Sequence, residues 1–321
     1  MRALVIGCGY VGLPLAVELS RRGHEVYGVC RSYERAVAIS KAGVNHIVTD
    51  LSEPTALEAV EPAFDWIVNT ISSSKGGLDD YRAVYLEGTR RILRWLEEWQ
   101  PSPPGDWPPG ACPAGSSIPL RKYVYTSSTS VYAQTDGSWV TEESAAEPQS
   151  ETSRVLVETE RLLSNAARAK DFPAVILRVA GIYGPERGHL FQQYLRGEVR
   201  ISGNGSRLIN MIHRDDVVAS IIAALERGQP GAIYNVADDE PVTQLEYFRW
   251  LGDKLSMPMP PFAPEAENAT RKRGLTNKRV SNQKLRLELG CELKYPTFRQ
   301  GYSAEIARLQ AAGQLPVGPG Q

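Results

Sequence analysis

Residues 2–12 read RALVIGCGYVG, a short apolar run that leads directly into three glycines. The run is rich in branched side chains, which is typical of a strand buried in a parallel sheet. Residues 11–22 then place leucines and alanine at helical spacing, so we expect a helix to start at once. The spacing G-x-G-x-x-G between a strand and a helix is the pattern of a dinucleotide-binding turn.

Each glycine of this loop is expected to have its own structural role. Gly7 permits the tight turn, Gly9 lets the backbone approach a pyrophosphate, and Gly12 lets helix and strand pack closely. The start of the helix adds free N–H groups and the positive end of its dipole. We therefore predict that the loop binds the phosphates of a dinucleotide.

The rest of the chain continues to alternate strands and helices. Further strands are expected at 25–30, 44–50, 65–71, 122–128 and 173–179, and helices at 78–99 and 152–170. This alternation predicts an α/β Rossmann fold, a doubly wound parallel sheet with helices on both faces, and a smaller C-terminal substrate-binding region. The expected division is 1–178 for the nucleotide-binding domain, 179–208 and 237–314 for the smaller region, strand segments near 209–236 returning to the sheet, a Pro-rich loop at 101–119 and a tail at 315–321.

Composition excludes several classes of protein. The 321 residues are 42% hydrophobic and 23% charged, with a formal net charge of -1, which argues against global disorder and against a basic nucleic-acid-binding face. No run is apolar enough to span a membrane, and the four cysteines and four histidines lack disulfide-scaffold or metal-ligand spacing. We expect a soluble, cytoplasmic monomer or homodimer with a small-molecule substrate, buried reduced thiols, and no nucleic-acid, membrane or metal partner.

The end of the second strand bears on which dinucleotide binds. A cofactor with a free ribose 2′-hydroxyl calls for Asp or Glu about 20 residues after the glycines. Arg31 stands there instead, followed by Ser32 and Arg35, and a guanidinium suits a 2′-phosphate. NADP(H) is therefore the preferred cofactor and NAD(H) remains possible; solvated surface arginines are the alternative. Asp50 is either an adenine contact or an ordinary turn residue.

Several motifs together resemble the extended short-chain dehydrogenase/reductases, the NAD(P)-dependent epimerase/dehydratase family. They are YVYTSSTSVYA at 123–133, LRVAGIYGP at 177–185, MIHRDDV at 211–217 and IYNV at 233–236. The resemblance covers nearly the whole chain and implies the Rossmann fold and a nicotinamide cofactor. The candidate cofactor contacts are then Gly7, Gly9, Tyr10, Val11, Gly12, Arg31, Ser32, Arg35, Asp50, Leu51, Ser72 and Ser127.

The catalytic residues depart from the family pattern. The resemblance implies Ser128 as the serine that orients the substrate oxygen, but its tyrosine and lysine positions fall on Thr152 and Leu156. Threonine is far too weak an acid for the tyrosine's role, and leucine carries no charge. An atypical subgroup of the family shares this loss and segments such as SN at 281–282 and YP at 295–296. Tyr132, Tyr183 and His213 are substitute acid/base candidates, each with a packing or structural alternative, so the candidate catalytic residues are Ser128, Thr152 and Tyr183.

Three interpretations follow. The chain is an NADP-dependent reductase, dehydrogenase or epimerase acting on a small or sugar-like substrate, a nucleotide-binding sensor without turnover, or an assembly protein that uses its Pro-rich loop as a contact. Arg207 and the cluster 271–273 are candidate phosphate contacts, with a solvated charged face as the alternative.

Overall fold

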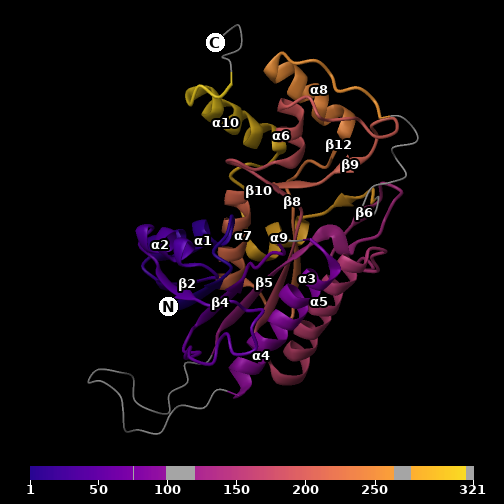
Figure 1. Ribbon diagram of the computed structural model, residues 1–321. Helices are drawn as coiled ribbons and strands as arrows, with labels where there is room; N and C mark the ends of the chain where they lie inside the picture. Colours follow the sequence, from indigo (N-terminus) through magenta and orange to yellow (C-terminus); the bar gives the residue numbers. More distant parts are fainter. Residues whose placement is uncertain (75, 99–119, 264–275, 316–321) are drawn as a thin grey trace, which may run out of the picture. The chain divides into compact units, whose positions relative to one another are not determined.

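The main element of the structure is a seven-stranded parallel sheet flanked by helices (Figure 1). The structure is a computed structural model that describes residues 1–74, 76–98, 120–263 and 276–315. The strand order is β11-β7-β5-β4-β1-β2-β3. The strands are β1 (Arg2–Ile6), β2 (Glu25–Cys30), β3 (Asn45–Val48), β4 (Trp66–Asn69), β5 (Lys122–Ser128), β7 (Ala174–Val179) and β11 (Ile233–Val236).

This strand order confirms the predicted doubly wound α/β fold. The chain runs outward from β1 through β2 to β3, then returns to place β4 on the other side of β1. The direction of winding therefore reverses at β1, and in such sheets ligands bind outside the carboxyl ends of the strands at that reversal. The glycine loop begins at the carboxyl end of β1.

The helices of the first half largely match their expected positions. They are α1 (Gly12–Arg21), α2 (Tyr33–Lys41), α3 (Leu78–Tyr81), α4 (Gly88–Glu98) and α5 (Glu151–Lys170). The one helix expected over 78–99 is interrupted, because residues Arg82–Glu87 form a π-helical segment between α3 and α4. The spacing of apolar residues predicts that this stretch is helical. It does not reveal that one turn contains an extra residue.

The chain divides into two compact units that alternate along the sequence. The first comprises the described part of Met1–Thr126 with Val155–Ile176 and Ala224–Ala232. The second comprises Ser127–Arg154, Leu177–Ala223 and the described part of 233–321. The bounds predicted for the two domains stay a prediction.

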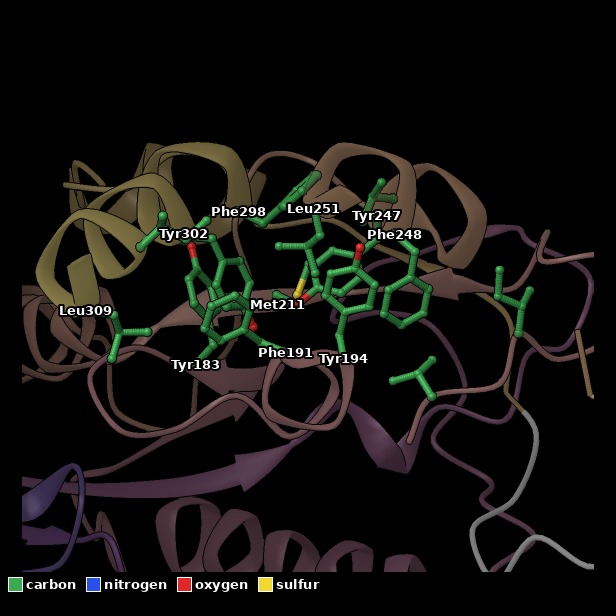
Figure 2. Packing of buried hydrophobic residues seen from close by; sticks show 14 residues of the cluster. Tyr183, Phe191, Tyr194, Met211, Tyr247, Phe248, Leu251, Phe298, Tyr302 and Leu309 are labelled. Atoms are coloured by element: carbon green, nitrogen blue, oxygen red, sulfur yellow. The ribbon is translucent and has the colours of Figure 1, made fainter. Parts of the chain in front are cut away.

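The second unit is built from short elements around an aromatic core. Its further strands are β6 (Trp139–Val140), β8 (Gly181–Tyr183), β9 (Leu208–Ile209), β10 (Met211–His213), β12 (Val242–Thr243) and β13 (Arg279–Val280). Its helices are α6 (His189–Leu195), most of α7 (Arg214–Arg227), α8 (Gln244–Leu255), α9 (Gln283–Leu289) and α10 (Phe298–Ala311). Figure 2 shows the tyrosines and phenylalanines of α6, α8 and α10 packed together with Tyr183.

Some predicted features lie outside the described residues. They are the Pro-rich loop at 101–119, which contains Cys112, the basic cluster 271–273, and positions 316–321 of the tail. Cys8, Cys30 and Cys291 are buried. Within the described ranges, no helix has both the length and the apolar character needed to cross a membrane.

Candidate functional site

Two glycines of the loop between β1 and α1 leave no room for a side chain. Gly7 has a φ of +93°, and a Cβ there would lie 2.8 Å from the backbone nitrogen of Ile71. A Cβ on Gly12 would lie 2.2 Å from the carbonyl oxygen of Gly7. Both distances are far inside van der Waals contact, so the fold itself requires glycine at these two positions.

Gly9 differs from its two neighbours in the motif. A Cβ built on Gly9 would meet only the carbonyl oxygen of Gly7, at 3.9 Å, which is an ordinary contact distance. The fold would therefore accept a side chain here. The space left free beside the Gly9 backbone is the space that an approaching pyrophosphate needs.

The N-terminus of α1, which follows the loop, carries a partial positive charge that no acidic residue of its first turn offsets. Val11, at the N-cap of α1, makes no side-chain hydrogen bond to the helix, and the first turn contains no acidic residue. The partial positive charge of the helix N-terminus is therefore not neutralised by the helix's own side chains. Together with Gly9, this end of α1 suits a phosphate group.

The arginines expected to meet a 2′-phosphate lie beside this loop. Arg31 and Arg35 are exposed, and the Ser32 hydroxyl caps α2 by accepting the backbone N–H of Arg35 at 3.3 Å. The Nε of Arg35 donates to the carbonyl oxygen of Cys8 at 2.9 Å. A positive charge is thus anchored to the glycine loop itself, and Arg31 is exposed.

Asp50 accepts hydrogen bonds within its own turn. Its Oδ1 receives the backbone N–H and the hydroxyl of Ser52 at 2.9 and 2.8 Å. Burial raises the pKa of Asp50, but the Ser52 hydrogen bonds and the charges of Arg31 and Arg91 outweigh it, so the pKa lies below the ordinary value. Arg91 also donates to the carbonyl oxygen of Leu51 at 2.9 Å. The turn role is present, and a contact with adenine stays a prediction.

The segment after β4 is tied to the glycine loop. The hydroxyl of Thr70 donates to the carbonyl oxygen of Gly7 at 2.9 Å. Ser72 is exposed, and the backbone N–H of Ser73 donates to the hydroxyl of Tyr85 at 3.2 Å. Tyr85 belongs to the π-helical segment Arg82–Glu87, so this segment contains the residue that accepts the hydrogen bond from Ser73.

In the second unit, the turn after β5 is linked to the start of α5. The hydroxyl of Ser128 accepts the backbone N–H of Ser130 at 3.1 Å, and the hydroxyl of Ser153 donates to that of Ser130 at 3.1 Å. Thr152 precedes Ser153 and is half-buried, as is Ser128. Ser127 is buried. These hydrogen bonds hold the candidate serine and threonine on neighbouring segments.

Tyr183 lies inside the aromatic core of the second unit. Its ring stacks on Tyr302 with centroids 4.4 Å apart and meets His213 edge-on at 5.3 Å (Figure 2). Its hydroxyl is buried and has no hydrogen-bond partner in the structure as described. Burial, reinforced by the negative charge of Asp238, raises the pKa of Tyr183 far above its ordinary value. This environment favours packing over acid/base chemistry near neutral pH, and the catalytic assignment stays a prediction.

The other substitute candidates are also enclosed. The hydroxyl of Tyr132 accepts from Arg178 at 2.9 Å and donates to the Oδ1 of Asn235 at 2.8 Å. His213 accepts the backbone N–H of Asp215 at its Nδ1, at 3.1 Å, and burial lowers its pKa to about 4. Both side chains are therefore held in structural hydrogen bonds of the second unit.

Sequence reasoning missed the buried lysine Lys278. It lies next to β13 and is 5% exposed. Burial, with a smaller effect from Arg207, lowers its pKa to about 8. In the sequence it belongs to a basic pair, Lys278-Arg279, followed by the single apolar residue Val280, and this pattern does not distinguish a buried lysine from a solvated one. In the described ranges, no group of three His, Cys, Asp or Glu side chains is arranged to hold a metal ion.

The strand order and the glycine loop between β1 and α1 define the Rossmann class of α/β folds. Within that class, the sequence model of the "NAD dependent epimerase/dehydratase family" matches residues 3–237, and the chain belongs to this family. The resemblance seen in the sequence is thereby confirmed.

Relatives span nearly the whole chain. Protein YeeZ of Escherichia coli (strain K12) is 25% identical over 302 residues, covering 92% of this chain and 96% of that protein. A 3-diazoavenalumate denitrifying reductase of Streptomyces sp is 26% identical over 332 residues, covering 95% of this chain and all of that protein. The solved structure of DesIV, a dTDP-glucose 4,6-dehydratase from Streptomyces venezuelae with NAD and TYD bound, has a TM-score of 0.78 at 19% identity over 98% of this chain and 99% of that one, which shows a shared fold.

Proposed function

We propose that this protein is an oxidoreductase that binds NADP(H) in preference to NAD(H) and transfers a hydride to or from a small or sugar-like substrate. The observation that carries the proposal is the free space beside Gly9, in a loop whose other two glycines are required by the fold. The N-terminus of α1 supports phosphate binding at the same place. Gly7, Tyr10, Val11 and Gly12 complete the loop around the pyrophosphate.

The basic residues after β2 support the preference for NADP(H). Arg31 stands where an acidic residue would hold a free 2′-hydroxyl, and Arg35 is anchored to the glycine loop through Cys8. A guanidinium forms charge-assisted hydrogen bonds with a phosphate. In this proposal Arg31, Ser32 and Arg35 surround the 2′-phosphate, and Asp50 and Leu51 lie at the adenine. Ser72 and Ser127 contact the remainder of the cofactor.

The resemblance aligns the family's tyrosine and lysine with Thr152 and Leu156, and such a loss favours simple hydride transfer over epimerisation. A bound NADPH would supply the hydride, and Ser128 would hydrogen-bond the substrate. Reactions that create or consume an alcohol need a tuned proton donor, which neither Thr152 nor the buried Leu156 provides. An electron-poor acceptor develops less negative charge on oxygen and depends less on that donor. The Streptomyces relative named as a denitrifying reductase of a diazo compound fits this direction.

A sensor without turnover is the second candidate, because Leu156, which the family resemblance aligns with the lysine position, is apolar and only 4% exposed. Oxidation of NADPH in the presence of electron-poor acceptors distinguishes the two. Turnover supports the reductase, whereas cofactor binding without turnover across such a panel supports the sensor.

The test of the proposal is calorimetric titration of NADPH into the wild-type protein, Gly9→Ala and Gly88→Ala. The added Cβ of Gly9→Ala enters the phosphate space, so we expect at least a ten-fold loss of affinity, and the larger Gly9→Val should abolish binding. Gly88 lies in α4, where a Cβ would meet only the Ala83 carbonyl oxygen at 3.7 Å, so Gly88→Ala serves as the matched control. Thermal melts should show that all variants are folded. Equal NADPH affinity in wild type and Gly9→Ala would mean that the loop is not the phosphate site.

A further inference from the structure

Lys278 places a buried ammonium group among neutral acceptors. Its Nζ donates to the backbone carbonyl oxygen of Tyr132 at 2.9 Å and to the hydroxyl of Thr276 at 3.0 Å. Among the residues that the structure describes, no carboxylate forms an ion pair with it. An ammonium has three hydrogens, so one of them has no acceptor among the described residues.

This arrangement is costly for a group that would serve the fold alone. Desolvation disfavours a buried cation unless an opposite charge compensates it. The charge that acts on Lys278 is that of Arg207, which is also positive. Replacing such a cation by an apolar side chain of similar length is expected to be neutral or stabilising. The cation therefore calls for a partner that the described residues do not supply.

The surroundings of Lys278 connect it to the candidate catalytic segment. Tyr132 follows the turn that begins at Ser128. The chain beside Lys278 is fixed by two hydrogen bonds, from the Asn277 nitrogen to the Gln134 carbonyl at 2.8 Å, and from the Leu208 nitrogen to the Asn277 Oδ1 at 2.9 Å. The segments carrying Tyr132, Arg207 and Lys278 are thus held together within the second unit.

We propose that Lys278, together with Arg207, binds an anionic group of the substrate, a carboxylate or a phosphate. The inference rests on the proposed function in one respect: the anionic group is part of the substrate that exchanges a hydride with the cofactor. The third ammonium hydrogen of Lys278 donates to the anion, and Arg207 adds the second positive charge. The phosphate-binding residues proposed for the loop and for the end of β2 all belong to the first unit, whereas Lys278 and Arg207 belong to the second.

The test compares wild type with Lys278→Met and with Lys254→Met, an exposed lysine of α8 that serves as the matched control. Three probes distinguish the source of the anion: inorganic phosphate, UDP and the aromatic carboxylate cinnamate. Binding is followed by calorimetry and thermal melts, with and without saturating NADPH, because NADPH occupies the phosphate site proposed at the glycine loop. Lys278→Gln is a second variant, whose amide can still donate to the Tyr132 carbonyl without carrying a charge.

We expect at least one probe to bind wild type and Lys254→Met, and to bind both Lys278 variants at least ten-fold more weakly. Without probe, Lys278→Met should melt at the same temperature as wild type or higher, and NADPH affinity should not change. Binding of UDP and phosphate alone identifies a phosphate, and binding of cinnamate alone a carboxylate. Equal probe affinity in wild type and both Lys278 variants, or no binding of any probe to wild type, would overturn the inference. Failure of NADPH to bind would instead contradict the proposed function and leave the anion result standing.

Discussion

Glycines of one short loop have different physical reasons to be glycine. Gly7 adopts a left-handed backbone angle against Ile71, and Gly12 packs on the carbonyl of Gly7. Gly9 meets no such restriction. The sequence predicts all of these roles from spacing, but only the positions of neighbouring atoms separate a glycine that the turn requires from one that leaves space for a ligand.

Asp238 is a residue whose ionisation should change stability. Its Oδ1 accepts the backbone N–H of Glu240 at 3.2 Å, and its buried Oδ2 has no partner among the described residues. Burial, with smaller effects from the charges of Glu240 and Asp239, raises the pKa of Asp238 well above 3.8, although backbone hydrogen bonds from Glu240 and Phe298 act in the opposite direction. The folded state therefore holds this proton more tightly than the unfolded state does, and each tenfold difference corresponds to about 1.4 kcal/mol.

For a carboxyl with a raised pKa, the stabilising effect is complete below the unfolded pKa and is lost as the pH rises through the folded one. Asp238→Asn removes this dependence and keeps an oxygen for the Glu240 N–H. We predict that the free energy of unfolding of Asp238→Asn, relative to wild type, increases by at least about 1 kcal/mol between pH 5 and pH 8. Denaturant titrations at several pH values measure it. If the free energies of unfolding of the two proteins change in parallel with pH, the pKa of Asp238 is the same in the folded and the unfolded state, and the prediction is wrong.

At the scale of elements, the turn after β5 and the start of α5 hold the residues to which catalysis was assigned. Ser130 and Ser153 join these two segments, and Ser128 caps the turn. We predict that Ser128→Ala lowers turnover of NADPH by about 10²–10³-fold with an acceptor found by screening, because a hydrogen-bond donor to the substrate is lost. Thr152→Ala should cost less than about ten-fold, because the threonine hydroxyl is far too weak an acid to serve as a general acid/base near neutral pH.

Steady-state oxidation of NADPH measures both variants, and their melting temperatures provide the control for folding. The reverse order, with Thr152→Ala inactive and Ser128→Ala active, would show that the helix was aligned wrongly with the family motif. If both variants retain full activity, proton transfer takes place elsewhere, and Tyr132 and Tyr183 should be substituted next.

Some helices and strands are predicted well from sequence patterns, and others are not. Apolar runs predict the strands of the main sheet and the helix α5 to within a few residues. The interruption of the expected helix at 78–99 coincides with a contact between segments, the hydrogen bond from the Ser73 backbone to Tyr85. The two- and three-residue strands of the second unit, such as β9 and β13, are too short to carry a period of two.

For the whole molecule, the alternation of strands and helices predicts the class of fold because crossovers between parallel strands follow few possible courses. The cofactor loop is predictable for the same reason, since it lies at a fixed place in that fold. The second unit is not predictable in this way. The burial of Tyr183 and Lys278 results from how α10, β8 and the segment before β13 pack, and single residues give no sign of such packing. A Cβ on Gly301 of α10 would lie on the Tyr183 hydroxyl, so this packing itself depends on a glycine in a helix.

The central claim, that the glycine loop and the arginines after β2 bind NADP(H), is tested most directly by equilibrium titration of wild type and Arg31→Ala with NADPH and NADH. A charge-assisted contact with the 2′-phosphate contributes about 1.5–3 kcal/mol, so wild type should bind NADPH roughly ten-fold or more tightly than NADH. Arg31→Ala should weaken NADPH binding by a similar factor and leave NADH binding nearly unchanged. Equal or tighter binding of NADH by the wild-type protein would contradict the claim.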